Sequence, residues 1–166
     1  GHDLGADSPG TLLRQVSCSQ GAVDVDIVLS VRPDYGLSRP LLDAVDGGIV
    51  IGAGATALSF STPVPFQPGP DAAMARVALR AGDVLGFALH SRAGAGGETV
   101  LWSQAEIARR LEDTVQGWSS WSGMHQNYRG PWQDLVAGSG RILQALTYYP
   151  TGAVVAAPTT SLPEVA

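Results

Sequence analysis

Asp24 and Asp26 are two closely spaced carboxylates that could do acid–base chemistry. Two carboxylates can hydrolyse a glycosidic bond when they face each other across a cleft, ~5 to ~9 Å apart. This pair lies in the stretch AVDVDIVLSVRP, where apolar and polar residues alternate. Alternation of this kind places both carboxylates on the solvent face of one strand. We therefore interpret them as solvated surface residues rather than as a catalytic pair.

Other reactive residue types form no recognisable constellation. The sequence contains no Walker loop and no CxxC, HExxH or GxSxG motif. His2, His90 and His125 are widely spaced, and we interpret His90 as an ordinary strand residue. Cys18 is the sole cysteine and reads as a small buried hydrophobic residue. We expect neither a metal ion nor another cofactor.

Aromatic residues gather in the stretch WSSWSGMHQNYRGPW, which contains Trp118, Trp121, Tyr128 and Trp132. Flat aromatic faces can stack on sugar rings, so Trp121, Tyr128 and Trp132 are candidate sugar contacts. The same residues could instead cement a helix against its neighbours, because large aromatic side chains bury much surface. We favour packing and keep sugar contact as the alternative.

The last stretch, PTGAVVAAPTTSLPE, combines small residues with the hydroxyl groups of Thr159, Thr160 and Ser161. Small residues allow a close backbone approach to another surface. Hydroxyl groups can fix turns or bind polar ligands. The composition alone is suggestive of a site but does not define one.

The first hundred residues carry the period-two pattern of antiparallel strands. TLLRQVSC and AVDVDIVLSVRP are expected to pair as a hairpin, followed by a loop at RPDYGLSRP. Four further strands are expected at GIVIGA, ALSFST, ARVALR and VLGFALHS. Short strands separated by turn signals predict an antiparallel β-sandwich. The fold class is therefore mainly β with C-terminal helices.

Helical signals begin at Ser103, where SQAE matches a capping box that is completed by Glu106. A second helix is expected from Pro131, a favourable residue in a first helical turn, to Tyr148. Its apolar residues recur at spacings of three and four, which predicts one apolar stripe. The residues of this stripe are Trp132, Leu135, Val136, Ile142, Leu143 and Leu146.

Composition excludes some classes of protein. The net charge is −5 and every basic residue is arginine, which argues against a nucleic-acid partner. No apolar run approaches the roughly 18 residues of a membrane span. A single cysteine and the absence of a signal-peptide pattern lead us to expect a cytoplasmic protein.

Four stretches resemble glycoside hydrolase family fifteen, the glucoamylase-like and trehalase-like enzymes. LTYYPTGAVVAAPTTSLPE is similar to the signature that ends the first helix of their catalytic domain. LLRQVSCSQGAVDVDIVLSVRPDYG resembles the second part of their N-terminal β-sandwich. VQGWSSWSG and YRGPWQDLVAGSGRILQALTY resemble the linker helix and the beginning of the helical toroid.

The resemblance implies three domain segments. Residues 1–101 would be an incomplete β-sandwich of the supersandwich type, residues 102–130 a linker helix with an aromatic loop, and residues 131–166 the first helix and loop of a truncated (α/α) toroid. In this family one glutamate acts as general acid and another as general base, with inversion, and both lie downstream of the stretch seen here. The resemblance places one loop at the rim of the substrate pocket, with Pro158, Thr159, Thr160, Ser161 and Glu164 as its residues.

The leading hypothesis is therefore a non-catalytic segment that supports the toroid of an α-glucoside hydrolase, of trehalase or glucoamylase type. The chain alone is expected to be inactive. Because its sheet edges and apolar helix lack partners, we expect it to self-associate, to swap segments or to pack the last helix back on the sheet. A stand-alone β-sandwich carbohydrate-binding module is the first alternative. The second is an interaction module whose helix 131–148 docks on a partner chain.

Overall fold

The computed structural model describes residues 10–53, 56–70, 72–93 and 99–158. Pro9–Leu111 forms one compact unit, and the chain from Glu112 belongs to a second one. The boundary between the units lies inside a helix, and the domain limits at residues 101 and 130 stay predictions. No helix among the described residues combines the length and apolar character that crossing a bilayer requires.

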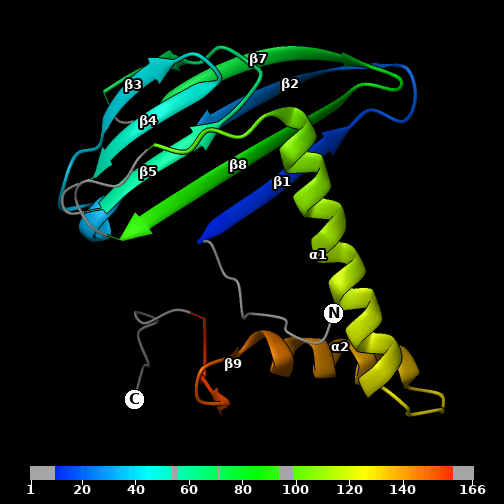
Figure 1. Ribbon diagram of the computed structural model, residues 1–166. Coiled ribbons are helices and arrows are strands. Elements are labelled where there is room, and N and C mark those ends of the chain that lie inside the picture. Colours follow the sequence, from blue (N-terminus) through cyan, green and yellow to red (C-terminus); the bar gives the residue numbers. More distant parts are fainter. Residues whose placement is uncertain (1–9, 54–55, 71, 94–98, 159–166) are drawn as a thin grey trace, which may run out of the picture. The chain divides into compact units, whose positions relative to one another are not determined.

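The first unit is built from two antiparallel sheets, shown as arrows in Figure 1. The five-stranded sheet has the order β1-β8-β5-β4-β3, and the three-stranded sheet has the order β2-β7-β6. The strands of the larger sheet are β1 (Thr11–Ser17), β8 (Val84–Ala93), β5 (Thr56–Ser61), β4 (Gly48–Ala53) and β3 (Leu41–Val45). Those of the smaller sheet are β2 (Ala22–Leu29), β7 (Ala73–Arg80) and β6 (Gln67–Pro68), and a 3₁₀ turn, η1, occupies Pro33–Gly36. The predicted fold class is confirmed.

The predicted hairpin between the first two strands is wrong. β1 pairs with β8, and β2 pairs with β7. The connection from β1 to β2 crosses between the sheets, and it is held beside the β7–β8 connection by backbone hydrogen bonds. The Cys18 N–H donates to the Asp83 carbonyl at 3.0 Å, and the Gly82 N–H donates to the Cys18 carbonyl at 2.9 Å. A tight turn in the sequence therefore marks a change of sheet here.

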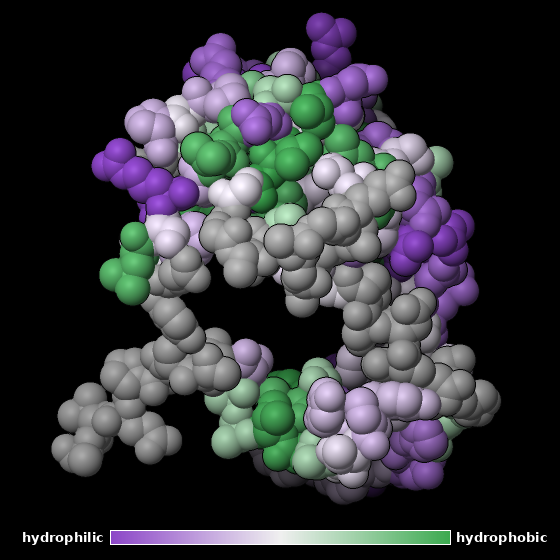
Figure 2. All heavy atoms as spheres, turned by 60° about the vertical axis from the view of Figure 1, so that its left-hand side comes forward, coloured by the Kyte–Doolittle hydropathy of each residue, from purple (hydrophilic) through white to green (hydrophobic). Residues whose placement is uncertain are grey.

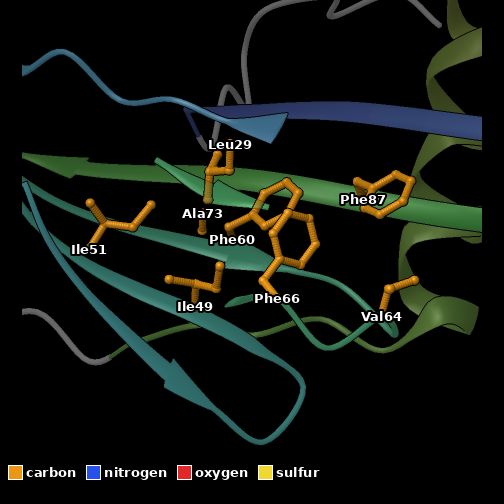
Figure 3. Packing of buried hydrophobic residues seen from close by; sticks show 8 residues of the cluster. All are labelled: Leu29, Ile49, Ile51, Phe60, Val64, Phe66, Ala73 and Phe87. Carbon is orange, nitrogen blue, oxygen red and sulfur yellow. The ribbon is translucent and has the colours of Figure 1, made fainter. Parts of the chain in front are cut away.

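The hydrophobic core lies between the two sheets and draws residues from both (Figure 3). Ile51 is fully buried, and Phe60 packs edge-to-face on Phe66 with ring centroids 5.5 Å apart. Leu29 and Ala73 reach the same cluster from β2 and β7. This shared core explains why strands that are separated in the sequence form one compact unit.

Helix α1 (Gln104–His125) is fixed to the larger sheet at its first turn. The Gln104 side-chain amide donates to the Gly86 carbonyl and accepts from the Gly86 N–H, at 2.9 and 2.7 Å. Ser61 is the last β5 residue that pairs with β8. Beyond that point, the Gln104 side chain takes the place of a neighbouring strand and continues the hydrogen bonding of β8. Ile107 packs directly on Gly86 and is fully buried. Sheet and helix start thus form one rigid element.

The predicted helix start at Ser103 is confirmed by a cap in which the Ser103 hydroxyl accepts from the Glu106 N–H at 3.2 Å. The Glu106 carboxylate accepts hydrogen bonds from Arg109 and Arg110, and not from the Ser103 N–H as the predicted capping box requires. These bonds, that from Arg109 first, lower the pKa of Glu106 to about 2. The Arg110 guanidinium also lies 4.1 Å from the centroid of the Trp102 ring, a cation–π contact.

Helix α2 (Gln133–Ala145) belongs to the second unit and is shorter than the helix predicted over residues 131–148. Thr147–Tyr148 instead forms β9, which pairs with β10 (Ala153–Val154) in a small hairpin. Gly152 adopts a positive φ of 71° in the connecting turn, where the Gly152 N–H donates to the Tyr148 carbonyl at 2.8 Å. The helix therefore ends at Ala145, earlier than the Tyr148 end that the apolar spacing predicts.

Candidate functional site

A cleft of about 550 Å³ lies within the second unit, between the end of α1, the connection 126–132 and α2. Trp121 and His125 contribute from α1, Tyr128 from the connection, and Ala137 and Arg141 from α2. The cleft falls within the ~300 to ~1,000 Å³ range of small-molecule sites. It is larger than the clefts lined by Phe87 and by Gly47, of about 280 and 230 Å³, and it contains two of the three candidate sugar contacts, Trp121 and Tyr128.

The aromatic wall of the cleft follows from helical spacing. Trp118, Trp121 and His125 lie three and four residues apart, so they share one face of α1. The Trp118 and Trp121 rings meet edge-to-face with centroids 6.0 Å apart, and the Trp121 and His125 rings are 5.4 Å apart. Trp121 stays partly exposed at the cleft although it contacts Trp118. Stacked neighbours hold the orientation of the ring.

Gln126, which directly follows α1 and lines the cleft, is bonded to α2. Its side-chain N–H₂ donates to the Ala137 carbonyl of α2 at 2.8 Å. α2 presents Gly140 at this point, where an added Cβ would lie 2.6 Å from the Gln126 Nε2 atom. The bond between the helices therefore depends on a residue without a side chain at position 140.

The charged groups that line the cleft are both arginines, Arg129 and Arg141. None of the lining residues is aspartate or glutamate. The cleft accordingly has a cationic lining in a chain whose net charge is −5. It offers recognition by stacking and hydrogen bonding, and no pair of carboxylates for acid–base hydrolysis.

The other predicted candidates lie apart from this cleft. Asp24 and Asp26 are exposed and lie 3.8 and 3.4 Å from the Arg76 guanidinium, as expected for a solvated strand face. The His90 imidazole shares a 2.6 Å hydrogen bond with the Thr11 hydroxyl. Cys18 is buried, as predicted. No cluster of three metal-ligating side chains occurs in the described part of the chain.

The predicted pocket-rim residues lie mostly outside the described residues. Thr159, Thr160, Ser161 and Glu164 are among these, and Pro158 is exposed. Of the three candidate sugar contacts, Trp121 and Tyr128 line the cleft. Trp132 precedes α2, is 63% exposed and is not a lining residue.

Sequence reasoning missed the polar half of the cleft, formed by Gln126, Arg129 and Arg141. A signal was present in the aromatic connection, where the amides of HQN and the arginine of YRG lie beside the aromatic residues. Arg141 follows Gly140 on α2 and lies outside the predicted apolar stripe of that helix. The pattern did not indicate that these groups would share one cleft.

Comparison with known proteins adds sequence relatives to this geometry. No protein-family profile matches the chain. A trehalase of Mycolicibacterium smegmatis is 30% identical over 95% of the chain and 24% of its own length. A trehalase of Thermoplasma volcanium is 25% identical over 84% of the chain and 22% of its own length. A trehalase of Mycobacterium tuberculosis is 41% identical over 59 residues, which are 36% of the chain and 9% of that protein.

The chain thus spans about a quarter of the length of the relatives that it matches over most of its own residues. The similarity runs through both the sheet unit and the helical unit, since 84–95% of the chain is aligned. Over most of its length, the chain is a distant relative of the trehalases.

Proposed function

We propose that the chain is a non-catalytic segment of an α-glucoside hydrolase that acts on trehalose. The observation that carries the proposal is the similarity to trehalases over 84–95% of the chain but only 22–24% of the relatives. In this proposal the whole enzyme hydrolyses its substrate with inversion, and the catalytic acid and base lie outside these residues. Maltose-type and isomaltose-type substrates are the alternatives to trehalose, and we propose a cytoplasmic location.

The distribution of carboxylates supports a non-catalytic role. The cleft has no carboxylate among its lining residues, and Asp24 and Asp26 lie beside Arg76 on an exposed strand face. Inverting hydrolysis needs two carboxyl groups separated by room for a water molecule. The clefts lined by Trp121, by Phe87 and by Gly47 each have at most one carboxylate among their lining residues.

The surface of α2 supports a structural role. Its predicted apolar stripe is exposed: Leu135, Ile142 and Leu143 have exposed fractions of 67%, 63% and 58%. Apolar side chains lie at the surface of the described chain, where Figure 2 shows them in green. Covering a leucine or isoleucine completely is worth ~1.5 to ~3 kcal/mol. We propose that the remainder of the hydrolase covers this stripe, and that the loop from Pro158 onward forms the rim of its substrate pocket.

The first test is a glucose-release assay of the purified 166-residue chain with trehalose, maltose and isomaltose. We expect no turnover of any of the three sugars. Glucose release that persists through repurification would overturn the assignment of a non-catalytic segment. Sedimentation of the same sample tests whether the uncovered stripe leads to self-association.

The second test asks whether the chain can act as part of a trehalase. The chain is co-expressed with the Mycolicibacterium smegmatis trehalase from which the matching stretch has been removed. We expect trehalose hydrolysis to return with the natural chain and to fall at least tenfold with Leu143→Gln, because a buried amide without a partner is costly. Ala145→Gln, at an exposed position on the same helix, is the matched control. Equal activity of the two variants would refute the role of the stripe.

The alternative of a stand-alone carbohydrate-binding module is favoured by one observation. Trp121 and Tyr128 line the same cleft, as a stacking site requires. Calorimetric titration with trehalose, maltose and isomaltose separates the two functions. Binding of a neutral sugar without hydrolysis would place the binding module ahead of the supporting segment.

A further inference from the structure

The cleft between α1 and α2 combines three kinds of recognition group, and the proposed support of a catalytic domain uses none of them. Its wall is aromatic, with Trp121 and Tyr128. Its charged groups are the guanidinium groups of Arg129 and Arg141. Amide side chains complete the lining at Gln126 and Asn127.

The charge of the cleft selects for an anion. Among the described residues, neither Arg129 nor Arg141 forms an ion pair, and the lining contains no carboxylate that could neutralise them. This arrangement contrasts with Arg76, Arg109 and Arg110, each of which is paired with a carboxylate. Clefts lined by one sign of charge concentrate ligands of the opposite sign. Guanidinium groups bind phosphate with two parallel hydrogen bonds, which adds geometric selectivity.

The aromatic groups select for a flat organic body next to that anion. Trp121 is held by its contacts with Trp118 and His125, at centroid distances of 6.0 and 5.4 Å. A ring held in this way stacks at little entropic cost, and Tyr128 keeps 42% of its surface exposed for contact. The exposed hydroxyl and amide groups can pair with the hydroxyl groups of a sugar.

The cleft is also shaped by contacts within the second unit. The Gln126 bond to the Ala137 carbonyl fixes the connection to α2, and Gly140 leaves room for this close approach. The volume of about 550 Å³ can hold a monosaccharide or disaccharide. Both features make the cleft a preformed site rather than a gap between flexible segments.

We propose that this cleft binds a phosphorylated sugar, with its phosphate on Arg129 and Arg141 and its ring on Trp121. The inference goes beyond the proposed function and does not depend on it, because the chain can support a hydrolase with or without this ligand. It assigns the aromatic connection a binding role distinct from the hydrolysis of the neutral sugar.

The test is calorimetric titration of the 166-residue chain with glucose 6-phosphate, glucose and inorganic phosphate, each at low salt. We expect glucose 6-phosphate to bind at least ~10-fold more tightly than either of the other two, because it alone uses both the arginines and the aromatic wall. Raising the salt concentration should weaken its binding, since exposed charges are screened. Equal affinity for phosphate alone would overturn the sugar-binding part, and equal affinity for glucose alone would overturn the anion-binding part.

Variants assign the binding to the cleft. Arg141→Gln should reduce the affinity for glucose 6-phosphate by ~10-fold or more while far-UV circular dichroism stays unchanged, because a charge-assisted bond is lost. Arg39→Gln makes the same change of charge at an exposed site in the other unit and serves as the control. Equal affinities of the two variants, or no binding of glucose 6-phosphate by the natural chain, would refute the proposal.

Discussion

Adding one methyl group to Gly86 should destabilise the first unit, and truncating Ile107 should remove that effect. A Cβ atom on Gly86 would lie 2.7 Å from the Ile107 Cγ2 atom and 3.3 Å from the Gln104 Oε1 atom. Ile107 is fully buried, so it has little room to move away. Gly86→Ala therefore forces two packed groups apart at the point where α1 meets the sheet.

The expected magnitudes follow from the atoms involved. Overpacking of this kind costs ~1 to ~3 kcal/mol. Ile107→Ala removes three buried carbon atoms, worth about 2.4 kcal/mol in transfer free energy, and the remaining cavity brings the total to about 3 kcal/mol or more. In the double variant the new methyl group occupies space that the isoleucine has left. Gly86→Ala should then change the free energy of unfolding by less than about 0.5 kcal/mol, a coupling of ~1 to ~3 kcal/mol.

The assay is urea-induced unfolding of all four proteins, followed by the β-sheet circular dichroism signal. Midpoints and slopes give the four free energies of unfolding, provided that the slope stays constant. Gly48→Ala, which would place a Cβ against the Phe60 carbonyl oxygen, is the control, because its cost should not respond to Ile107→Ala. An equal cost of Gly86→Ala in both backgrounds would refute the packing of α1 on the sheet.

Two further predictions concern the start of α1 and the exposed helix. The pKa of Glu106 is lowered from 4.5 to about 2, so the unfolded state binds more protons between these values. Its contribution to stability is complete above pH 4.5 and is lost as the pH falls toward 2, and acid titration of Glu106→Gln should show a smaller loss over this window. On α2, Leu143→Gln should change the unfolding free energy of the isolated chain by less than about 0.5 kcal/mol, since the residue is 58% exposed, whereas Ile51→Ala should cost ~2 to ~5 kcal/mol in the same urea assay.

The alternation of residues located most strands but not their partners. GIVIGA coincides with β4, and ALSFST is displaced by one residue from β5. β3 was not predicted because four of its five residues are exposed, so its sequence lacks the alternation of apolar and polar residues. The pairing of β1 with β8 depends on contacts between residues 67 to 79 positions apart, which no local pattern contains. The alternation of apolar residues indicates which face of a strand is buried, whereas the tertiary fold determines which strand lies beside it.

Proline-rich segments illustrate the same limit inside the core. The proline-rich stretch TPVPFQPGPD, which follows the predicted strand ALSFST, contributes β6 and two core residues. Phe66 is 7% exposed, and its ring lies at 84° to the Phe60 ring. Prolines mark where strand pairing is interrupted, but they do not determine whether the intervening side chains point inward.

The candidate cleft was predictable from residue types only in part. Trp121 and Tyr128 were identified because aromatic residues are conspicuous in a short stretch of the sequence. The arginines were not, because Arg129 lies in a connection and Arg141 lies away from the apolar stripe of α2. Their proximity arises from the turn between α1 and α2, which is fixed by the Gln126 bond and by Gly140. The composition of a site between two helices therefore depends on the connection that joins them as much as on the residues of each helix.

The two faces of α2 therefore require different surroundings, one apolar and one polar. The stripe with Leu135, Ile142 and Leu143 is exposed and requires an apolar partner. The face with Ala137, Gly140 and Arg141 already packs against Gln126 and borders a polar cleft. A partner that covered Leu135, Ile142 and Leu143 would leave most of the cleft accessible, because Val136 is the stripe residue that also lines the cleft. Support of a catalytic domain and binding of an anionic sugar are thus compatible functions of one short helix, and Leu143→Gln and Arg141→Gln should affect them independently.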